Sequence, residues 1–343
     1  MSAPAPLKLS FCMTAYNRAR LIGATLESII SQATEECEIV VLDGGSTDDT
    51  PDVIAKYAAR FPRLRYIRLE TNTGMDQGFD SAVEMARGEY CWVLSCKDLV
   101  KPGAVATVLA HLRKDPSVVV VNMEIKDTTL SNALVARSAT VESDVIYGPE
   151  EADRLFSDAL NLINHVSCSI IKREIWIGRE RVRYYDTLYI IPAIIFQRPL
   201  PGKAILVAEP LLCHRFGGQS WLTHAIRQPF RWSSLVDSLP FSEQTKRKHA
   251  RSSRMERLTD MLLLRAFGLF TWSEYRRFSR LYPDLSRKLP APRIVALFPG
   301  RLLNTLLVFK TKLGTNPYRK VILERLKASH FHVRNWGSSK EHA

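Results

Sequence analysis

The amino-acid sequence predicts an α/β protein built on a mostly parallel sheet that is covered by helices. Over the first 125 residues, short apolar runs rich in valine and isoleucine alternate with segments whose apolar residues recur at helical spacing. The apolar runs are nearly continuous, which is typical of strands buried on both faces, and a β-α-β-α-β alternation favours a parallel sheet. Polar and glycine-rich stretches follow these runs, at the edge where such sheets bind ligands.

Strands and helices follow one another in order along this first part. The predicted strands cover residues 7–14, 37–43, 64–70, 90–94 and 117–125. The predicted helices cover residues 21–32, 51–61, 79–88 and 104–114. Gly88 is expected to close the third helix. Asp80 either contacts a ligand or caps the start of that helix at Phe79, and we prefer the cap.

The pattern becomes less regular from about residue 128. Residues 167–176 and 203–216 are predicted strands, and residues 185–197 a buried helix that Pro192 interrupts. Beyond residue 226 the chain is mainly helical and basic, with apolar helices predicted over 255–270 and 301–314. We therefore expect one domain over residues 1–225 and a basic helical region over residues 226–343.

Charge is distributed unevenly between these two parts. The chain holds 48 Lys+Arg and 35 Asp+Glu, a net charge of +13. Residues 226–343 hold 24 basic and 8 acidic residues, a net +16, which leaves 24 and 27, a net −3, for residues 1–225. A region this basic attracts a polyanion, either an anionic lipid surface or nucleic acid. Because no nucleic-acid-binding motif accompanies it, we expect an anionic membrane surface as partner and no nucleic acid.

Cysteine usage and the apolar runs bear on the compartment. The six cysteines form no C-x-x-C pair and lie mostly in apolar runs: Cys12, Cys37, Cys91, Cys96, Cys168 and Cys213. Cysteines of this kind pack as small buried hydrophobes, which argues against zinc or disulfides and favours a reducing cytosol. The first residues do not resemble a signal peptide, and no run of ~18 apolar residues is present to span a bilayer. We expect a cytoplasmic protein, peripheral at the inner face of the cell membrane.

The stretch GEYCWVLSCKDLVKPG, residues 88–103, indicates a buried strand that runs into a charged loop and a helix start. At this position of an α/β protein, a pair of carboxylates would hold a metal ion against a diphosphate. The loop offers Ser95, Cys96, Lys97 and Asp98, so a lysine lies among the candidate ligands. Three interpretations follow: a metal site, a site in which a fixed cation replaces the metal, and an ordinary loop.

Four motifs in order resemble a known family. They are MTAYNRARLIGATLESIISQ, EIVVLDGGSTDDT, NTGMDQGFDSAVEMARGEYCWVLS and the KPGAV that follows. Together they resemble the N-terminal half of family 2 glycosyltransferases, over about residues 7–125 and more weakly to HRFGGQSW near 214–221. The GEYCW variant is similar to the abequosyltransferase-like branch of bacterial surface-polysaccharide enzymes. The resemblance implies a GT-A fold, a nucleotide-diphospho-sugar donor and inversion at the anomeric carbon, with the nucleotide-binding half at 7–125 and the acceptor half at 126–225.

The resemblance implies that the donor nucleotide contacts the ends of the first two strands. Thr14, Tyr16 and Asn17 follow the first strand, where a turn and a hydroxyl can contact the base. Asp43 ends the second strand and can accept a hydrogen bond from a uracil or thymine N–H or from a ribose hydroxyl. From this residue alone, an Asx turn or a helix cap is the better interpretation of Asp43, and Ser46 or Thr47 could cap equally well; the whole motif favours nucleotide binding. Gly44 stands where many family members carry a second acid.

The third loop and the loop after the fourth strand complete the implied donor site. Asn72, Gly74 and Asp76 border the nucleotide in the family, although a solvated turn is as good an interpretation for Asp76. In relatives, acids at positions matching Ser95 or Lys97, together with Asp98, hold Mg²⁺ or Mn²⁺ against the donor diphosphate.

Here Asp98 is the acid that remains in that loop, and an ammonium group pairs well with phosphate. We therefore expect reduced or no metal dependence, with Lys97 facing the diphosphate. Mg²⁺ or Mn²⁺ on Asp98 stays open, because magnesium binds through a single carboxylate plus substrate phosphates.

An inverting transferase needs a general base to deprotonate the acceptor hydroxyl. The family usually places an acid before a helix in the region of RYYDTLYII, which makes Asp186 the candidate. A plain helix N-cap is the alternative for Asp186. Glu150, Glu151 and Asp153 are poorer candidates, because they resemble the charged first turn of a helix.

Two further signals are weaker. QPFRW, residues 228–232, matches the QxxRW pattern of processive family 2 synthases, but Arg231 and Trp232 are equally consistent with a surface charge and a core aromatic. His214 and Trp221 are suited either to an acceptor site or to the core.

The function predicted from the sequence is transfer of a sugar to a lipid-linked or polysaccharide acceptor in bacterial cell-surface polysaccharide synthesis. A nucleotidyltransferase would need a glycine-rich phosphate loop, which TAYNRAR is not. A catalytically inactive GT-A domain that acts as a membrane-associated scaffold is the alternative, because of the lysine in the metal loop.

Overall fold

The computed structural model describes residues 6–217, 228–250, 258–281, 291–315 and 318–333. The chain divides into two compact units. The first comprises Met1–Phe216 with Ser238–Ser242, and the second comprises Gly217–Asp237 with Glu243–Ala343. The predicted boundary at residues 225 and 226 lies outside the described residues, as does Trp221.

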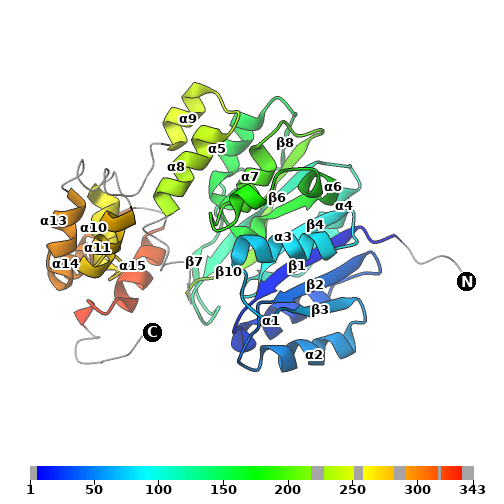
Figure 1. Ribbon diagram of the computed structural model, residues 1–343, viewed down its shortest axis with the longest axis horizontal. Coiled ribbons are helices and arrows are strands. Elements are labelled where there is room, and N and C mark those ends of the chain that lie inside the picture. Colours follow the sequence, from blue (N-terminus) through cyan, green and yellow to red (C-terminus); the bar gives the residue numbers. More distant parts are fainter. Residues whose placement is uncertain (1–5, 218–227, 251–257, 282–290, 316–317, 334–343) are drawn as a thin grey trace, which may run out of the picture. The chain divides into compact units, whose positions relative to one another are not determined.

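The first unit is built on one sheet with the strand order β3-β2-β1-β4-β9-β6-β10-β5 (Figure 1). Four strands at one side are parallel: β1 (Leu9–Ala15), β2 (Cys37–Asp43), β3 (Leu64–Arg68) and β4 (Tyr90–Ser95). β6 (Val118–Lys126) and β10 (Ala204–Arg215) are parallel to each other. The predicted α/β fold with a mostly parallel sheet is confirmed.

One strand inside the sheet runs the other way. β9 (Ser169–Lys172) lies between β4 and β6 and is antiparallel to both. The predicted strand over 167–176 was therefore too long. The chain turns into the short helix α6 (Arg173–Ile177) after Lys172, because Ile175 and Trp176 are buried there at helical spacing. Short strands complete the sheet: β5 (Leu99–Val100), β7 (Ala133–Val135) and β8 (Val145–Tyr147).

Helices connect the strands. The first four are α1 (Ala19–Ile30), α2 (Thr50–Arg60), α3 (Met75–Met85) and α4 (Ala104–Leu112). α3 packs across β1 and β2 (Figure 1). It begins at Met75, after Gly74 with φ +86°, so the prediction that Asp80 caps a helix starting at Phe79 was wrong.

Gly88 does not close α3 either, since the helix ends at Met85 with Ala86 in extended backbone. Gly88 instead allows the chain to pass close to Ser10 of β1. The Gly88 N–H donates to Ser10 Oγ at 2.8 Å, and a Cβ at this position would lie 2.5 Å from that oxygen. A glycine is required because the strand β1 passes directly beside it.

The core of the first unit is apolar and densely packed. Phe11 and Trp92 stack with ring centroids 5.3 Å apart. All six cysteines are buried, as predicted for small hydrophobes. Every residue of α7 (Ile190–Phe196) is buried, and Pro192 is accommodated because it lies in the first turn, where a helix needs no backbone donor. α5 (Ala152–Ile163) follows Glu151, which confirms the helix start expected around Glu150, Glu151 and Asp153.

The described residues of the second unit are helical. Its helices are α8 (Gln228–Ser238), α9 (Glu243–Ala250), α10 (Leu258–Ala266), α11 (Trp272–Leu281), α13 (Ala291–Leu297), α14 (Gly300–Leu313) and α15 (Arg319–Ala328). The last residue of α8 belongs to the first unit. Two small cores hold the helices from α10 to α15 together, one around Phe270 and Val295 and one around Leu303 and Leu326.

Within the described residues, no helix by itself has the length and apolar composition to cross a membrane. α13 and α14 meet those criteria only when taken together, and they are bent by 97° at the break between them.

Candidate active site

The site forms where three parallel strands end side by side. Residue register places Thr14 of β1 beside Ser95 of β4, and Ala15 of β1 beside Asp43 of β2. The loops after β1, β2 and β4 therefore meet at one edge of the sheet, as the sequence predicted for a ligand site. Gly78 of α3 covers Thr14 closely, since a Cβ there would lie 3.0 Å from Thr14 Oγ1.

The loop after β1 is tied to the loop after β2. Asn17 has a positive φ of +53°, which is uncommon for a residue with a side chain. Its Oδ1 accepts a hydrogen bond from the Thr47 N–H at 2.8 Å, and its own N–H donates to Ser46 Oγ at 2.9 Å. Asn17 thus holds the two loops together, while the neighbouring Tyr16 ring is 42% exposed at the surface.

Asp43 is completely buried, with protein partners on both carboxylate oxygens. Oδ1 accepts from the Ser46 N–H at 2.9 Å and from Ser46 Oγ at 2.5 Å, and Oδ2 accepts from Tyr66 Oη at 2.7 Å. Burial, together with this bond to Asp43, raises the pKa of Tyr66 well above its ordinary value. Asp43 therefore closes the turn that the sequence allowed as an alternative, and its contact with a nucleotide stays a prediction.

The loop after β3 faces a distant segment of the chain. Asn72 Oδ1 accepts from the Gly74 N–H at 2.9 Å. Asp76 is buried and accepts hydrogen bonds from the Leu188 N–H at 2.7 Å and the Ile190 N–H at 3.3 Å. The interpretation of Asp76 as part of a solvated turn was wrong, because its carboxylate holds the segment that precedes α7.

Asp186 lies on that segment, beside the loop after β3. It is exposed, has a φ of +61°, and its Oδ1 lies 3.4 Å from the position of a Cβ on Gly74. It does not cap a helix, since Tyr189 occupies the N-cap position of α7. The structure thus brings Asn72, Gly74 and Asp186 together, with the carboxylate of Asp186 at the surface.

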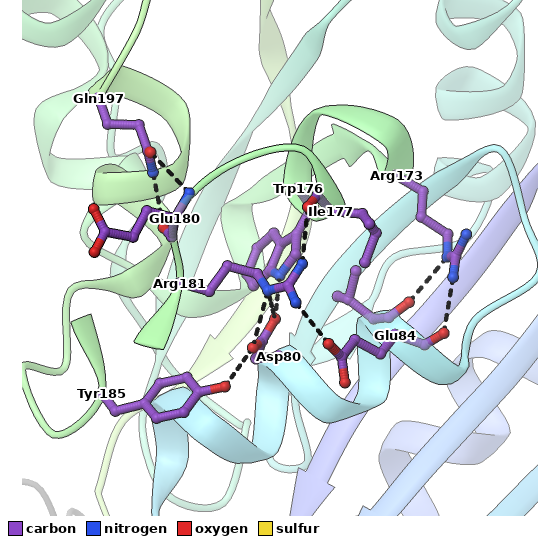
Figure 2. Close-up of polar contacts among 10 residues, drawn as sticks. Asp80, Glu84, Arg173, Trp176, Ile177, Glu180, Arg181, Tyr185 and Gln197 are labelled. Atoms are coloured by element: carbon purple, nitrogen blue, oxygen red, sulfur yellow. Dashed lines mark hydrogen bonds and ion pairs between the residues drawn. The ribbon is translucent and has the colours of Figure 1, made fainter. Parts of the chain in front are cut away.

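The backbone around Asp186 is anchored to α3 by a second buried acid. Asp80 accepts hydrogen bonds from Trp176 Nε1 at 2.8 Å and from Tyr185 Oη at 2.5 Å (Figure 2). Arg181 Nε lies 3.0 Å from Asp80 and its Nη2 2.7 Å from Glu84 (Figure 2). Burial and the bond to Asp80 raise the pKa of Tyr185 well above its ordinary value, so its hydroxyl stays a donor. Asp76 and Asp80 together fix both sides of Asp186.

Asp98 lies at the centre of a group of polar side chains in the site. It is completely buried, and its carboxylate accepts from Ser167 Oγ at 2.5 Å and lies 2.8 Å from His214 Nδ1. His165 Nε2 is 3.8 Å from the carboxylate and 2.8 Å from His214 Nδ1. Ser167 Oγ also accepts from the Ser95 N–H at 3.0 Å, which fixes the end of β4.

Opposing effects set the pKa values in this group. Burial raises the pKa of Asp98, but the fields of His214 and His165 and the hydrogen bond from His214 outweigh it, so the carboxyl pKa lies well below its usual range. Burial lowers the pKa of His165 to about 3, with the neighbouring His214 adding to the effect. Asp98 is therefore ionised and His165 neutral near pH 7, and a neutral imidazole has a lone pair for a ligand.

This group is chemically suited to a divalent cation. One ligand atom from each of Asp98, His165 and His214 lies within 4.8 Å of the others. A carboxylate with imidazole nitrogens suits a transition metal better than Mg²⁺, which prefers oxygen ligands. Lys97 is half-buried, and its charge helps to lower the pKa of Asp98.

The sequence prediction counted ligands within the loop alone and so missed the histidines. The sequence left two interpretations open for His214, an acceptor-site residue and a core residue. In the structure His214 contacts the carboxylate of Asp98. His165 gave no signal, because a single histidine before an irregular stretch is uninformative. It reaches Asp98 only because the antiparallel β9 enters the sheet beside β4.

Other residues that the sequence singled out lie away from Asp98, His165 and His214, or outside the residues that the structure describes. Glu151 is the N-cap residue of α5 and accepts from the Gly148 N–H at 2.8 Å, in agreement with its predicted place at a helix start. Trp232 is buried in α8 and its Nε1 donates to the His249 carbonyl at 3.1 Å, as a core aromatic would. The side chain of Arg231 lies outside the described residues.

The sheet and the loops at the ends of β1, β2 and β4 define an α/β domain of the GT-A type. Residues 10–177 match the family described as glycosyl transferase family 2, so this part of the chain is a domain of that family.

Two relatives in sequence are polysaccharide synthases. Chondroitin synthase of Escherichia coli is 35% identical over 109 residues, which is 32% of this chain and 16% of that protein. Poly-beta-1,6-N-acetyl-D-glucosamine synthase of Staphylococcus epidermidis is 24% identical over 181 residues, 52% of this chain and 42% of that protein. The match thus spans less than half of the length of either relative.

Solved structures support the fold. S. aureus TarS 1-349, in complex with UDP-GlcNAc, superposes with a TM-score of 0.59 at 16% identity, over 94% of this chain and 93% of that one. The mannosyltransferase PcManGT from Pyrobaculum calidifontis, in complex with GDP-Man and Mn²⁺, gives a TM-score of 0.51 at 15% identity, over 98% and 90% of the two chains. The predicted GT-A fold and family 2 membership are confirmed; the resemblance to the abequosyltransferase-like branch stays a prediction.

Proposed function

We propose that this protein transfers a sugar from a nucleotide-diphospho-sugar donor to a lipid-linked or saccharide acceptor, with inversion, in the synthesis of a bacterial cell-surface polysaccharide. The proposal rests on the family 2 domain and, above all, on the ionised Asp98 beside His165 and His214 at the end of β4. The polysaccharide synthases among the relatives support the kind of product. The UDP and UDP-GlcNAc complexes of TarS support the kind of donor.

Donor binding is proposed at the edge formed by the loops after β1, β2 and β3. Tyr16 presents an exposed ring against which a base can stack, and Thr14 lies at the strand end below it. Asp43 lies beneath the surface, so it shapes the base pocket through Ser46 and Tyr66 unless the turn opens. Asn72 and Gly74 border the same edge.

We propose that Asp98 and His214, with His165, hold a divalent metal ion, preferably Mn²⁺. When bound, such an ion neutralises the charge that grows on the leaving diphosphate. The expectation of reduced metal dependence rested on Asp98 as the remaining ligand, and the two histidines argue against it. Lys97, on the same loop, would then add positive charge beside the diphosphate rather than replace the metal.

The proposed general base is Asp186. Its carboxylate is exposed beside Gly74, so an acceptor hydroxyl can approach it from solvent. As that hydroxyl oxygen attacks the anomeric carbon, its proton passes to the Asp186 carboxylate, and the electron pair of the breaking bond leaves with the diphosphate. The hydrogen bonds from Leu188 and Ile190 to Asp76 position the segment for this step.

A metal-dependent donor titration tests the proposal. The melting temperature of the protein is measured with UDP-, dTDP-, CDP- and GDP-sugars, with and without Mn²⁺. We expect one nucleotide class to stabilise the protein in the presence of Mn²⁺, and Asp98→Asn to lose that stabilisation. Asp52→Asn, an exposed acid on α2, is the matched control and should behave as the wild type. If no nucleotide sugar stabilises the wild type, the inactive scaffold becomes the better interpretation.

A further inference from the structure

Helix α14 has one apolar side that the second unit buries and fixes. Leu303 packs in a core with Ala266 and Leu326. Asn304 is completely buried, and its Nδ2 donates to the Ala266 carbonyl at 3.0 Å and the Leu326 carbonyl at 2.9 Å. These bonds set the rotation of α14 about its axis, because a turn of the helix would leave the buried amide unsatisfied.

The opposite side of α14 is also apolar but faces outward. Leu302, Leu306, Phe309 and Leu313 are 53%, 55%, 66% and 71% exposed. At about 100° per residue, these four side chains fall within an arc of about 60° on the helix surface. Four large exposed hydrophobic residues in one stripe exceed the scattered exposure that is usual on a soluble surface.

Helix α13, which precedes α14, also carries exposed apolar side chains. Ile294, Leu297 and Phe298 are exposed, while Val295 and Ala296 pack in the core around Phe270. The 97° bend between α13 and α14 places the two exposed apolar sides on consecutive short helices rather than on one long helix. We call seven exposed residues of α13, of α14 and of the break between them the apolar face: Ile294, Leu297, Phe298, Leu302, Leu306, Phe309 and Leu313.

Basic side chains border the stripe on both sides. Arg301, Lys310 and Lys312 are exposed on α14. On the same wheel, Arg301 and Lys312 lie about 80–100° to one side of Leu302 and Lys310 about 80° to the other. An apolar stripe with flanking Lys and Arg is the pattern of a helix that lies in the plane of a membrane interface, where the charged ends reach the lipid headgroups.

We propose that the apolar face is a docking surface for an anionic lipid bilayer, inserted at the headgroup boundary with Arg301, Lys310 and Lys312 on anionic headgroups. A second copy of this chain fits less well, because two such faces would bring like charges together. The net +16 of residues 226–343 adds attraction toward an anionic surface. This inference does not depend on the proposed transfer reaction.

Vesicle flotation of the full chain tests the proposal. We expect binding to vesicles of phosphatidylcholine with phosphatidylglycerol, and binding at least tenfold weaker to phosphatidylcholine alone. Leu306→Ser/Phe309→Ser should reduce the affinity for anionic vesicles at least tenfold. Ile146→Ser/Val182→Ser removes two equally exposed apolar residues from the first unit and should leave the binding unchanged.

The charge contribution is tested with a matched pair of variants. Lys310→Gln/Lys312→Gln should weaken vesicle binding and its salt dependence more than Arg247→Gln/Lys248→Gln, which removes the same charge from α9. Equal losses in both pairs would leave only general attraction and overturn the docking surface. Absence of vesicle binding, with self-association in sedimentation that Leu306→Ser/Phe309→Ser abolishes, would assign the face to a second copy and overturn the lipid proposal.

Discussion

Asp98 shows at the level of a single residue how the site can be both buried and charged. A buried, ionised carboxylate without hydrogen-bond or ionic partners would strongly destabilise the folded protein. Here Ser167 donates to one oxygen and His214 lies at the other, so the charge has partners before any ligand arrives. The same partners hold the carboxylate in one orientation.

Metal removal distinguishes the roles of Asp98 and Lys97. We expect excess EDTA to lower turnover by roughly 100-fold or more, because several kcal/mol of charge stabilisation at the leaving group would be lost. Added Mn²⁺ should restore it. Lys97→Ala should lower turnover about tenfold with the metal dependence intact, whereas full activity in EDTA and collapse in Lys97→Ala would show that the lysine replaces the metal.

At the scale of elements, the segment between α6 and α7 depends on α3. Removal of the Tyr185 hydroxyl breaks its bond to Asp80 but leaves Trp176 and Arg181 in place. We expect Tyr185→Phe to cost about 1 kcal/mol of stability, the usual contribution of such a bond. Because Asp186 would be held less firmly, kcat should fall while the KM for the donor stays unchanged.

Tyr184→Phe is the control for this prediction, since Tyr184 is the buried neighbour in the same turn. An equal loss of kcat in both variants would mean that the turn, and not the Tyr185 hydroxyl, positions Asp186. A rise in KM for the donor in Tyr185→Phe alone would place the segment in donor binding instead.

The approach of β1 to the chain after α3 gives a second prediction at this scale. Gly88→Ala would place a methyl group 2.5 Å from Ser10 Oγ and 2.8 Å from Ser10 N, so we expect destabilisation by about 1–3 kcal/mol. Gly23→Ala in α1 makes only ordinary contacts, at 3.4 Å from Tyr57, and should stabilise by up to about 1 kcal/mol through helix propensity. Urea unfolding of both variants measures the difference, and equal stabilities would contradict the contact.

The sequence specified local elements well where burial and periodicity agree. The residues of β2 were predicted without error, since Cys37–Asp43 is buried along its whole length. The start of α3 was missed, because the signal is the positive φ of Gly74 rather than a capping side chain. The cluster at Asp98 was incomplete for a different reason: the contacts of Asp98 with His165 and His214 depend on strand order, which no local pattern contains.

At the scale of the whole molecule, the stability of the folded protein should depend on pH. Burial lowers the pKa of His111 in the first unit and of His249 in the second. Below about pH 6.5 these histidines are protonated in the unfolded chain but still neutral in the folded chain. The free energy of unfolding therefore falls as the pH falls, by up to about 1.4 kcal/mol per pH unit for each histidine.

Melting temperatures between pH 7.5 and 5.0 measure this dependence. We expect them to fall toward pH 5.0, and we expect His111→Gln to reduce the fall in the transition that belongs to the first unit. A variant with the same pH dependence as the wild type would show that His111 takes up its proton equally in both states.

The strand β9 has a consequence for how the protein is made. A ribosome delivers Asp98 well before Ser167 and His214, the two residues that compensate its burial. Until β9 and β10 have been synthesised and have entered the sheet, the nascent first half therefore holds a carboxylate that must stay in water. The loops after β1 and β2 can form early, but the group around Asp98 is complete only after β10 has entered the sheet. A chain interrupted before residue 214 consequently lacks His214 and cannot complete the group that we propose holds the metal ion.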